Sequence, residues 1–455
     1  MKSVNVWWLA KVVVGVVWLG SGVELQAQRL TWLGTLPGGN FSYATGVSAD
    51  GSVVVGWAQS ANGLTHAFRW TQSGGMQDLG TLGGLMSDAR GVSADGSVVV
   101  GTAWNASVQF RAFRWTASGG MQDLGTLGGS TSEADGVSAD GSVVVGVAEN
   151  ASGEWRAFRW TASGGMQDLG TLGGSTSDAY GVSADGSVVV GSATNASGER
   201  RVFRWEGGVM QDIGPFGGGP CDRIQCRYSV SADGSVVIGT RINNNGDSRA
   251  VRWTATGGMQ EIGTLGGPMS EAYGVSADGS VVVGVAETAS IEVRAFRWTA
   301  SGGMEDLNTT FAALLTNGSV LAYAYAVSPD GRYIVGVGGN AATGRLEAFL
   351  LDTEGTTTAV ESRGFKDGLQ GELRIFPMPS AGAATLRFVS EQVGPVILEV
   401  VDVLGRVVFR WSGQVERVGV QSLGVSLGGL SSGRYQVRLR LPGHEVLTAP
   451  LMIVR

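Results

Sequence analysis

The sequence predicts an all-β protein: a seven-bladed β-propeller with four strands in each blade, closed by an N-terminal strand and followed by a small C-terminal β-sandwich. Three observations lead to this prediction. The segment GVSADGSVVVG begins at Gly46 and recurs, identical or drifted, to give seven copies. The copies are spaced by 45 to 52 residues, and a repeat of about 45 residues is the length of one propeller blade. The chain beyond residue 372 loses the repeat and shows short alternating strands.

Composition supports a folded β protein. The chain has 455 residues, of which 75 are glycine and 43% are hydrophobic, which is too apolar for a disordered glycine-rich tract. Its net charge is −7, with no basic cluster, so nucleic acid is not an expected partner. Because only two His and two Cys are present, we expect no metal site built from them and no cofactor.

Residues 1–28 have the pattern of a secretory signal peptide. Lys2 and Lys11 accompany a short apolar run, and LQAQ follows, with cleavage expected near Ala27. The alternative is a membrane anchor. The apolar run is about a dozen residues long, shorter than the roughly 20 residues that span a bilayer. We therefore expect an exported chain with no transmembrane segment after the signal is removed.

One repeat unit shows where the four strands of a blade begin. A short strand A runs through Ala89, and strand B starts at Ser97 in a β-branched run typical of a strand buried on both faces. A variable loop leads to strand C at Arg111, and a Gly-Gly turn leads to strand D at Met121. The unit therefore predicts one antiparallel four-stranded sheet.

An aspartate occupies the turn between strands A and B in every unit. Its carboxylate can bond the amides of the turn, and the following glycine supplies the positive φ that a tight hairpin needs. The alternative is a Ca²⁺ or catalytic carboxylate, but a single acid per turn is a poor cage for a cation that prefers six to eight oxygens. We interpret these residues as structural: Asp50, Asp95, Asp140, Asp185, Asp233, Asp278 and Asp330.

The ends of the repeat array predict ring closure. The last unit stops at Asp352 without a strand D, whereas residues 30–36 form an unattached strand D at the start of the mature chain. The first strand should therefore complete the last blade and leave no open edge. An Arg on strand C and an acid on strand D recur as an expected cross-strand pair. Leu350 and Trp32 replace this pair in the last blade.

One strand A position varies from blade to blade although its surroundings repeat. It holds Thr45, Arg90, Asp135, Tyr180, Tyr228, Tyr273 and Tyr325. Strand A lies beside the central channel, so these side chains either pack between blades or contact a ligand. The loops between strands B and C also vary and carry Trp104 and Trp155, and such loops often bind ligands on a rigid scaffold. Sugars or extended peptides would suit these residues.

No matched catalytic set stands out from the repeat, so the prediction is a non-catalytic binding or adhesion module. A surface structural protein without a specific ligand and a propeller enzyme acting on glycosides remain alternatives. Acids outside the repeat, gathered in the channel, would favour the enzyme, whereas aromatic residues there would favour the binding module.

The two cysteines, Cys221 and Cys226, are separated by four residues. In an exported chain this spacing favours a local disulfide. The alternative is a reactive thiol, which neither position supports because no histidine lies near it in the sequence.

Residues 353–371 are interpreted as a linker, and residues 372–455 resemble the C-terminal sorting domain of the bacterial type IX secretion system. The resemblance rests on FPMPS, VDVLGRVV, LSSGRYQVRL and the final IVR, in that order. Met378 stands where the family has Asn, and the usual late Lys is missing. The resemblance implies export by the type IX machinery of a Gram-negative bacterium to the cell surface or the medium. The domain would then be cleaved or used for attachment.

Residues 29–352 resemble the extracellular repeat family named for its HAF triplet. THAFRWT at Thr65 carries the resemblance, together with GGMQDLGTLGG and GVSADGSVVVG. Only His66 keeps the histidine of the triplet, and the other units have Arg or Glu in its place. The turn SPDGRYIVG at Ser328 also looks like turns of TolB-type propellers. The family implies a propeller-like fold but no activity that could be carried over.

Overall fold

A computed structural model describes residues 28–214, 228–243, 245–354, 373–376, 383–390, 392–402, 406–415, 419–427, 429–442 and 446–453. The expected signal peptide, most of the linker and the expected Cys221–Cys226 disulfide lie outside these residues. Among the described residues, no helix is long and apolar enough to cross a membrane.

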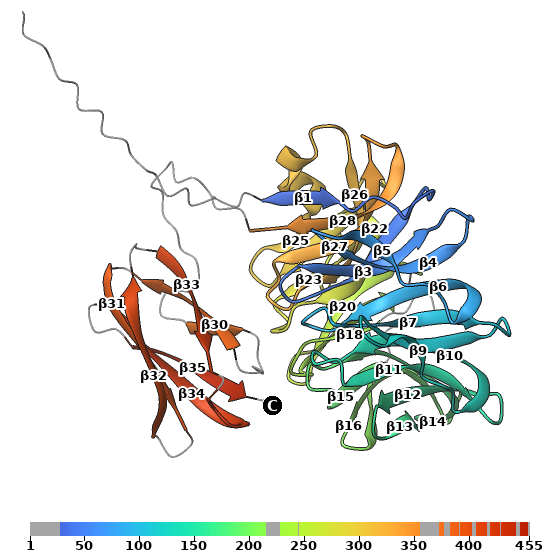
Figure 1. Ribbon diagram of the computed structural model, residues 1–455, viewed down its shortest axis with the longest axis horizontal. Helices are drawn as coiled ribbons and strands as arrows, with labels where there is room; N and C mark the ends of the chain where they lie inside the picture. The colour runs from blue at the N-terminus through green and yellow to red at the C-terminus, as the bar shows by residue number, and fades with distance from the viewer. Residues whose placement is uncertain are drawn as a thin grey trace, which may run out of the picture.

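The first part of the chain forms seven antiparallel sheets of four strands each, which confirms the predicted propeller (Figure 1). We name the strands of each blade A to D from the channel outward. The A strands are β2 (Ser42–Val47), β6 (Gly83–Val92), β10 (Gly128–Val137), β14 (Gly173–Val182), β18 (Ser229–Val230), β22 (Gly266–Val275) and β26 (Val320–Val327). The B strands are β3 (Val53–Gln59), β7 (Val98–Asn105), β11 (Val143–Asn150), β15 (Val188–Asn195), β19 (Val236–Ile242), β23 (Val281–Thr288) and β27 (Tyr333–Asn340).

The outer strands follow in the same order around the ring. The C strands are β4 (Thr65–Thr71), β8 (Phe110–Thr116), β12 (Trp155–Thr161), β16 (Arg200–Glu206), β20 (Ser248–Thr254), β24 (Val293–Thr299) and β28 (Arg345–Asp352). The D strands are β5 (Gly75–Asp78), β9 (Gly120–Asp123), β13 (Gly165–Asp168), β17 (Val209–Gly214), β21 (Gly258–Glu261), β25 (Gly303–Asp306) and, in the last blade, β1 (Arg29–Trp32).

The B strands are buried on both faces because each blade packs between two others. Val98, Val99 and Val100 are all buried, as a β-branched run without alternation predicts. Gly101 follows because strand A passes very close: a Cβ at this position would lie 2.0 Å from the carbonyl oxygen of Asp88. The repeated VVVG motif therefore reflects packing between blades at its valines and the close approach of strand A of the same blade at its glycine.

Five of the seven seams between blades show the same kind of hydrogen bond among the described residues. In blades 1 and 2, the Ala67 amide of strand C donates to Ser87 Oγ of the next strand A at 2.9 Å. A second set joins the A–B turns around one end of the channel, where the Ala49 amide donates to the Ala94 carbonyl at 2.8 Å. This set ends at Pro329, which accepts from the Ala277 amide but has no N–H to donate to Ala49.

The N-terminal strand closes the ring, as the fold prediction required. Strand β1 pairs antiparallel with β28 and places Trp32 opposite Phe349, and the two strands lie side by side in Figure 1 (blue and orange). The recurring seam bond is also present, because the Ala348 amide donates to Ser42 Oγ at 2.9 Å. Residues more than 300 positions apart are thereby joined as neighbouring blades.

The expected pair between the strand C arginine and the strand D acid is wrong. Arg114 lies opposite Gln122, and Asp123 lies opposite Phe113. This offset of one residue places Arg114 and Asp123 on opposite faces of the sheet. Asp123 instead lies 3.4 Å from Arg111 Nε. Arg114 Nε donates across the seam to the Gly141 carbonyl, also at 3.4 Å.

Strand boundaries and one connection differ from the expectation. Strand A begins earlier than the sequence suggested, since β6 spans Gly83–Val92, and strand D ends at Asp123. The D strand stops there because Asp123 accepts the Gly125 amide at 2.8 Å and Gly125 turns with φ 83°. The connection before the last blade contains helix α1 (Leu307–Thr310) and a 3₁₀ turn (Ala312–Leu314), neither of which the sequence analysis expected.

The C-terminal part forms the predicted sandwich. One sheet contains β29 (Leu373–Phe376), β30 (Ala383–Ser390) and β33 (Gly419–Ser426), and the other contains β31 (Gly394–Val401), β32 (Val407–Val415), β34 (Gly433–Arg440) and β35 (Val446–Ile453). Alternate residues of both sheets, among them Leu386, Leu398 and Leu439, meet in a single core. The segment thus has its own hydrophobic core, separate from those of the blades.

Candidate functional site

The seven variable strand A residues meet around one cavity. Thr45, Arg90, Asp135, Tyr180, Tyr228, Tyr273 and Tyr325 all line a hollow of about 170 Å³ on the propeller axis. We call these seven residues the channel ring. A second cavity of about 290 Å³ shares several of them and continues to the alanines of the A–B turns. The accessible part of the channel therefore extends from the ring toward the A–B turns.

The four tyrosines of the ring form two pairs. The ring centroids of Tyr180 and Tyr228 are 5.7 Å apart, and those of Tyr273 and Tyr325 are 5.3 Å apart. Tyr228 is only 5% exposed and belongs to the core between its blades, and burial raises its pKa to about 12. The other three are partly exposed to the cavity. Tyr228 therefore combines a packing role with its place in the ring.

Arg90 is the centre of a charged network at the same level. Its guanidinium contacts Asp88 at 2.7 Å, Glu133 at 3.0 Å and Asp135 at 2.8 Å. Burial would lower the pKa of Arg90, but the attraction of the three carboxylates raises it well above its ordinary value. The network joins two blades and fixes Arg90 and Asp135 of the ring to each other.

The residues two positions before the ring also vary, and they are not among the site residues predicted from the sequence. Four described blades place acids there: Asp88, Glu133, Asp178 and Glu271. Glu271 accepts the Tyr273 hydroxyl at 2.6 Å, and Asp178 pairs with Arg200, which also reaches the Tyr180 hydroxyl at 3.4 Å. These acids could have been found from the sequence. Comparing the repeat copies at the position two residues before the ring shows them.

The two loop tryptophans do not line either channel cavity. Trp104 packs edge-on against Phe110 in its own hairpin, with ring centroids 5.2 Å apart. Trp155 begins strand C of the next blade, opposite Glu149. The structure therefore brings the channel ring together but leaves Trp104 and Trp155 on separate B–C hairpins.

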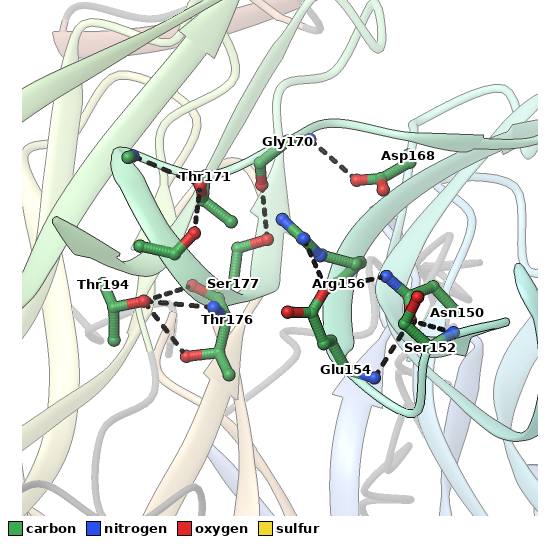
Figure 2. A network of polar contacts seen from close by, with 12 residues as sticks. Asn150, Ser152, Glu154, Arg156, Asp168, Gly170, Thr171, Thr176, Ser177 and Thr194 are labelled. Atoms are coloured by element: carbon green, nitrogen blue, oxygen red, sulfur yellow. Dashed lines mark hydrogen bonds and ion pairs between the residues drawn. The ribbon is translucent and has the colours of Figure 1, made fainter. Parts of the chain in front are cut away.

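The loops on the D–A and B–C face are fixed by internal hydrogen bonds. Asn150 Oδ1 accepts the amides of Ser152 and Glu154, both at 2.9 Å, and Ser177 Oγ donates to the Gly170 carbonyl at 2.5 Å (Figure 2). Arg156 binds Glu154 at 2.6 Å rather than crossing to Asp168 (Figure 2). The face that carries the variable loops is therefore a rigid surface.

The turn aspartates direct their carboxylates into their own turns. Asp95 Oδ1 accepts Ser93 Oγ at 2.6 Å, and the amide and hydroxyl of Ser97 at 3.0 Å and 2.8 Å. Gly96 supplies the turn with φ 72°. Burial raises the pKa of Asp95, but the bonds from Ser93 and Ser97 outweigh it and lower the pKa overall.

His66 lies on an outer strand rather than at the channel. Its Nδ1 is 2.8 Å from Asp78 Oδ2, in the position where Arg111 meets Asp123 in the next blade. Among the described residues, no group of three His, Cys, Asp or Glu side chains is arranged to hold a metal ion. The chemical character of the site is thus set by tyrosines, carboxylates and arginines.

Fold and site together define a seven-bladed propeller with a polar, partly aromatic channel. No family model and no curated protein sequence matches the chain. Solved structures similar to it include TolB from Acinetobacter baumannii, with 12% identity, 64% of this chain and 77% of that chain covered, and a TM-score of 0.39. The BP39L lectin from Burkholderia pseudomallei has 9% identity, coverages of 73% and 98%, and a TM-score of 0.43.

A third similar structure is a gluconolactonase from Xanthomonas campestris, with 12% identity, coverages of 72% and 91%, and a TM-score of 0.36. These proteins have unrelated functions on the same kind of scaffold. The likeness therefore concerns the fold, and a function has to be argued from the site of this chain.

Proposed function

We propose that the chain is an exported, non-catalytic binding module whose ligand enters the propeller channel at the channel ring. One observation carries this proposal. The repeat retains its turns, seams and strand cores from blade to blade, yet all seven copies of one varying position line a single cavity. Positions that the fold determines recur, so residues that vary around one hollow are best explained by contact with something in it.

Cavity size supports a ligand that inserts a narrow group. The hollows of about 170 Å³ and 290 Å³ lie at or below the lower end of the range for small-molecule sites, roughly 300–1,000 Å³. One sugar ring of a carbohydrate, or one side chain of an extended peptide, would fit. Tyr180, Tyr273 and Tyr325 offer apolar faces, while Arg90 and Asp135 offer hydrogen bonds.

The acids near the ring support binding more than catalysis. Asp88 and Glu133 are held by Arg90, Asp178 by Arg200, and Glu271 by the Tyr273 hydroxyl. Carboxylates engaged in this way orient the ring residues. An enzyme acting on glycosides would need two carboxylates free to face the scissile bond. A surface protein without a ligand would give no reason for the channel-ring residue to differ from blade to blade.

Export rests on the two ends of the chain. The N-terminal 28 residues have the signal-peptide pattern, and the sandwich from residue 372 resembles a type IX sorting domain. Together they favour passage through the type IX machinery to the outer surface or the medium of a Gram-negative bacterium. The lack of a basic cluster favours a glycan or peptide ligand over nucleic acid.

Binding arrays of glycans and peptides, probed with the purified exported protein, would test the proposal. Tyr273→Ala should weaken the ligand found by about tenfold, because an aromatic contact contributes roughly 0.5–1.5 kcal/mol beyond burial. Tyr273→Phe keeps the ring and should retain most of the affinity. Tyr435→Phe, in the sandwich, is a matched control outside the propeller. If the ligand binds the Tyr273→Ala and Arg90→Gln variants with the same affinity as the parent, the channel site is refuted.

A further inference from the structure

Five of the seven seams between blades are filled by the same arginine. The Arg before the strand C Trp directs Nε onto the carbonyl oxygen of the glycine in the next A–B turn, at 3.1–3.4 Å. The five donors are Arg69, Arg114, Arg159, Arg204 and Arg252. Arg297 of the sixth blade binds Glu305 instead. The guanidinium of this arginine therefore occupies the groove in five seams, whereas blade 6 keeps the arginine but directs it onto its own strand D.

The closing seam between blades 7 and 1 lacks this side chain. Leu350 holds the arginine position there, next to the turn of Gly51. The result is a cavity of about 520 Å³ lined by residues of both blades, among them Leu350, Trp70 and Gly51. It is larger than either channel cavity and lies within the range of roughly 300–1,000 Å³ for ligand sites. We call it the seam cavity.

Two further departures from the repeat shape the same place. Tyr333 stands where the other B strands begin with valine, and it lines the seam cavity. Gly51 packs directly on its ring, since a Cβ on Gly51 would lie 2.6 Å from it. Arg332 replaces the usual serine, lies 4.8 Å from the Tyr333 ring centroid, and binds Asp352 with two hydrogen bonds of 2.7 Å. The cavity wall is thereby held in one position.

The wall has the chemistry that recognises hydroxyl groups. Gln72 and Thr31 offer an amide and a hydroxyl, and Trp70 and Leu350 offer apolar surface. The wall carries charges of both signs: Asp352 pairs with Arg332, the Asp50 carboxylate accepts bonds from Ser48 and Ser52, and Arg29 is exposed at the rim. A strongly charged ligand would gain little from such a wall, but a neutral ligand with many hydroxyls could both donate and accept hydrogen bonds.

We propose that the seam cavity binds a neutral saccharide of one or two sugar rings. This site is separate from the channel and does not depend on the function proposed there. Closure requires only the β1–β28 pairing and the Ala348–Ser42 bond, so the loss of the arginine is not needed to close the ring. Three departures gathered at one seam open and stiffen a cavity that the repeat otherwise fills.

Leu350→Arg in the full chain restores the repeat residue and tests the site. An arginine at this position donates to the turn glycine in five other seams, so the variant should fold, melt no earlier than the parent and fill the cavity. A panel of neutral, amino and acidic mono- and disaccharides should yield at least one neutral sugar bound by the parent. Its affinity should fall by tenfold or more in Leu350→Arg, and about threefold or more in Gln72→Ala through a lost hydrogen bond. Leu350→Met keeps the volume and should bind normally.

Three outcomes overturn the proposal. The parent binds no neutral sugar, or only charged sugars bind. A bound neutral sugar is unaffected by Leu350→Arg and Gln72→Ala. A sugar loses affinity in Tyr273→Ala but not in these variants, which assigns it to the channel and supports the other site. If Leu350→Arg does not fold, Gln72→Ala alone decides between these results.

Discussion

Trp32 lies opposite Phe349 across the closing strand pair, with ring centroids 6.3 Å apart and planes at 75°. In the six other blades an Asp or Glu holds the position of Trp32. The residue two positions before the phenylalanine changes at the same time. It is His66 or an arginine elsewhere, but Glu347 in the last blade. The closing blade thus replaces a polar contact across the C–D hairpin with an aromatic one.

Removing this strand should leave the ring open. Deletion of residues 29–32 exposes the edge of β28 and the apolar side chains that Leu30 and Trp32 cover. An unpaired edge of this kind invites pairing with another chain. We expect the truncated protein to dimerise or aggregate, measured by size-exclusion chromatography with light scattering. The parent should not associate through this edge, because β1 covers it. A monomeric truncation with unchanged melting would contradict closure by β1.

Acid should weaken the propeller through its turn aspartates. Burial raises the pKa of Asp50, Asp95, Asp140, Asp185 and Asp233, but the bonds from their turn serines outweigh it and lower each below the ordinary 3.8. A lowered folded-state pKa means that the stabilisation is present above the unfolded value and lost as pH falls through the folded one.

We therefore expect the free energy of unfolding to decrease as pH falls below about 4, measured by urea titration. Asp140→Asn removes one titrating group and should make this decrease less steep. Its stability at neutral pH should drop by about 1 kcal/mol, since bonds from Ser138 and Ser142 weaken. An unchanged slope in a variant lacking two such aspartates would refute the linkage.

The repeat predicted the propeller because its signals are local. Asp-Gly turns such as Asp95-Gly96, the valine runs and the Gly-Gly turns each specify a structure without reference to distant residues. Ring closure also followed, since a strand D was missing at one end and present at the other. The face on which each outer-strand side chain lies could not be predicted. A register offset of one residue moved Arg114 and Asp123 to opposite sides of the sheet.

The site was predictable in part for a similar reason. Variation among the repeat copies identified the channel ring, including Arg90 and Asp135, because the seven units of one chain can be compared with one another. It did not reveal the seam cavity, which depends on Leu350, Trp70 and Gly51 from two blades at opposite ends of the sequence. Only the closed ring brings these residues together.

The sandwich should act as an export signal. Residues 372–455 have their own core, so their deletion should leave the propeller folded. The type IX resemblance predicts that the deleted protein accumulates in the periplasm of its host, measured by immunoblotting of cell fractions and medium. A matched deletion of strand β35 (Val446–Ile453) removes the last strand of the sandwich and should have the same effect. Normal release of both shortened proteins would contradict the prediction.

Two B–C loops hold branched residues in a backbone conformation that disfavours them. Val108 and Ile291 both have φ 60°, and their side chains are 61% and 60% exposed. Gly153 holds the equivalent position in another blade with φ 77°, and its amide donates to Asn150 just as the Val108 amide donates to Asn105, both at 3.0 Å. The left-handed conformation costs a non-glycine residue roughly 1–2 kcal/mol.

Val108→Gly and Ile291→Gly should therefore each stabilise the propeller by about 0.5–1 kcal/mol, since glycine relieves the strain but adds freedom to the unfolded chain. The loops lie in blades 2 and 6, so the double variant should show the sum of the two effects. Gly153→Val provides the reverse control and should destabilise by a similar amount. Urea unfolding measures all four proteins. If both glycine variants lose stability, the two exposed side chains must make contacts that outweigh their strained backbone.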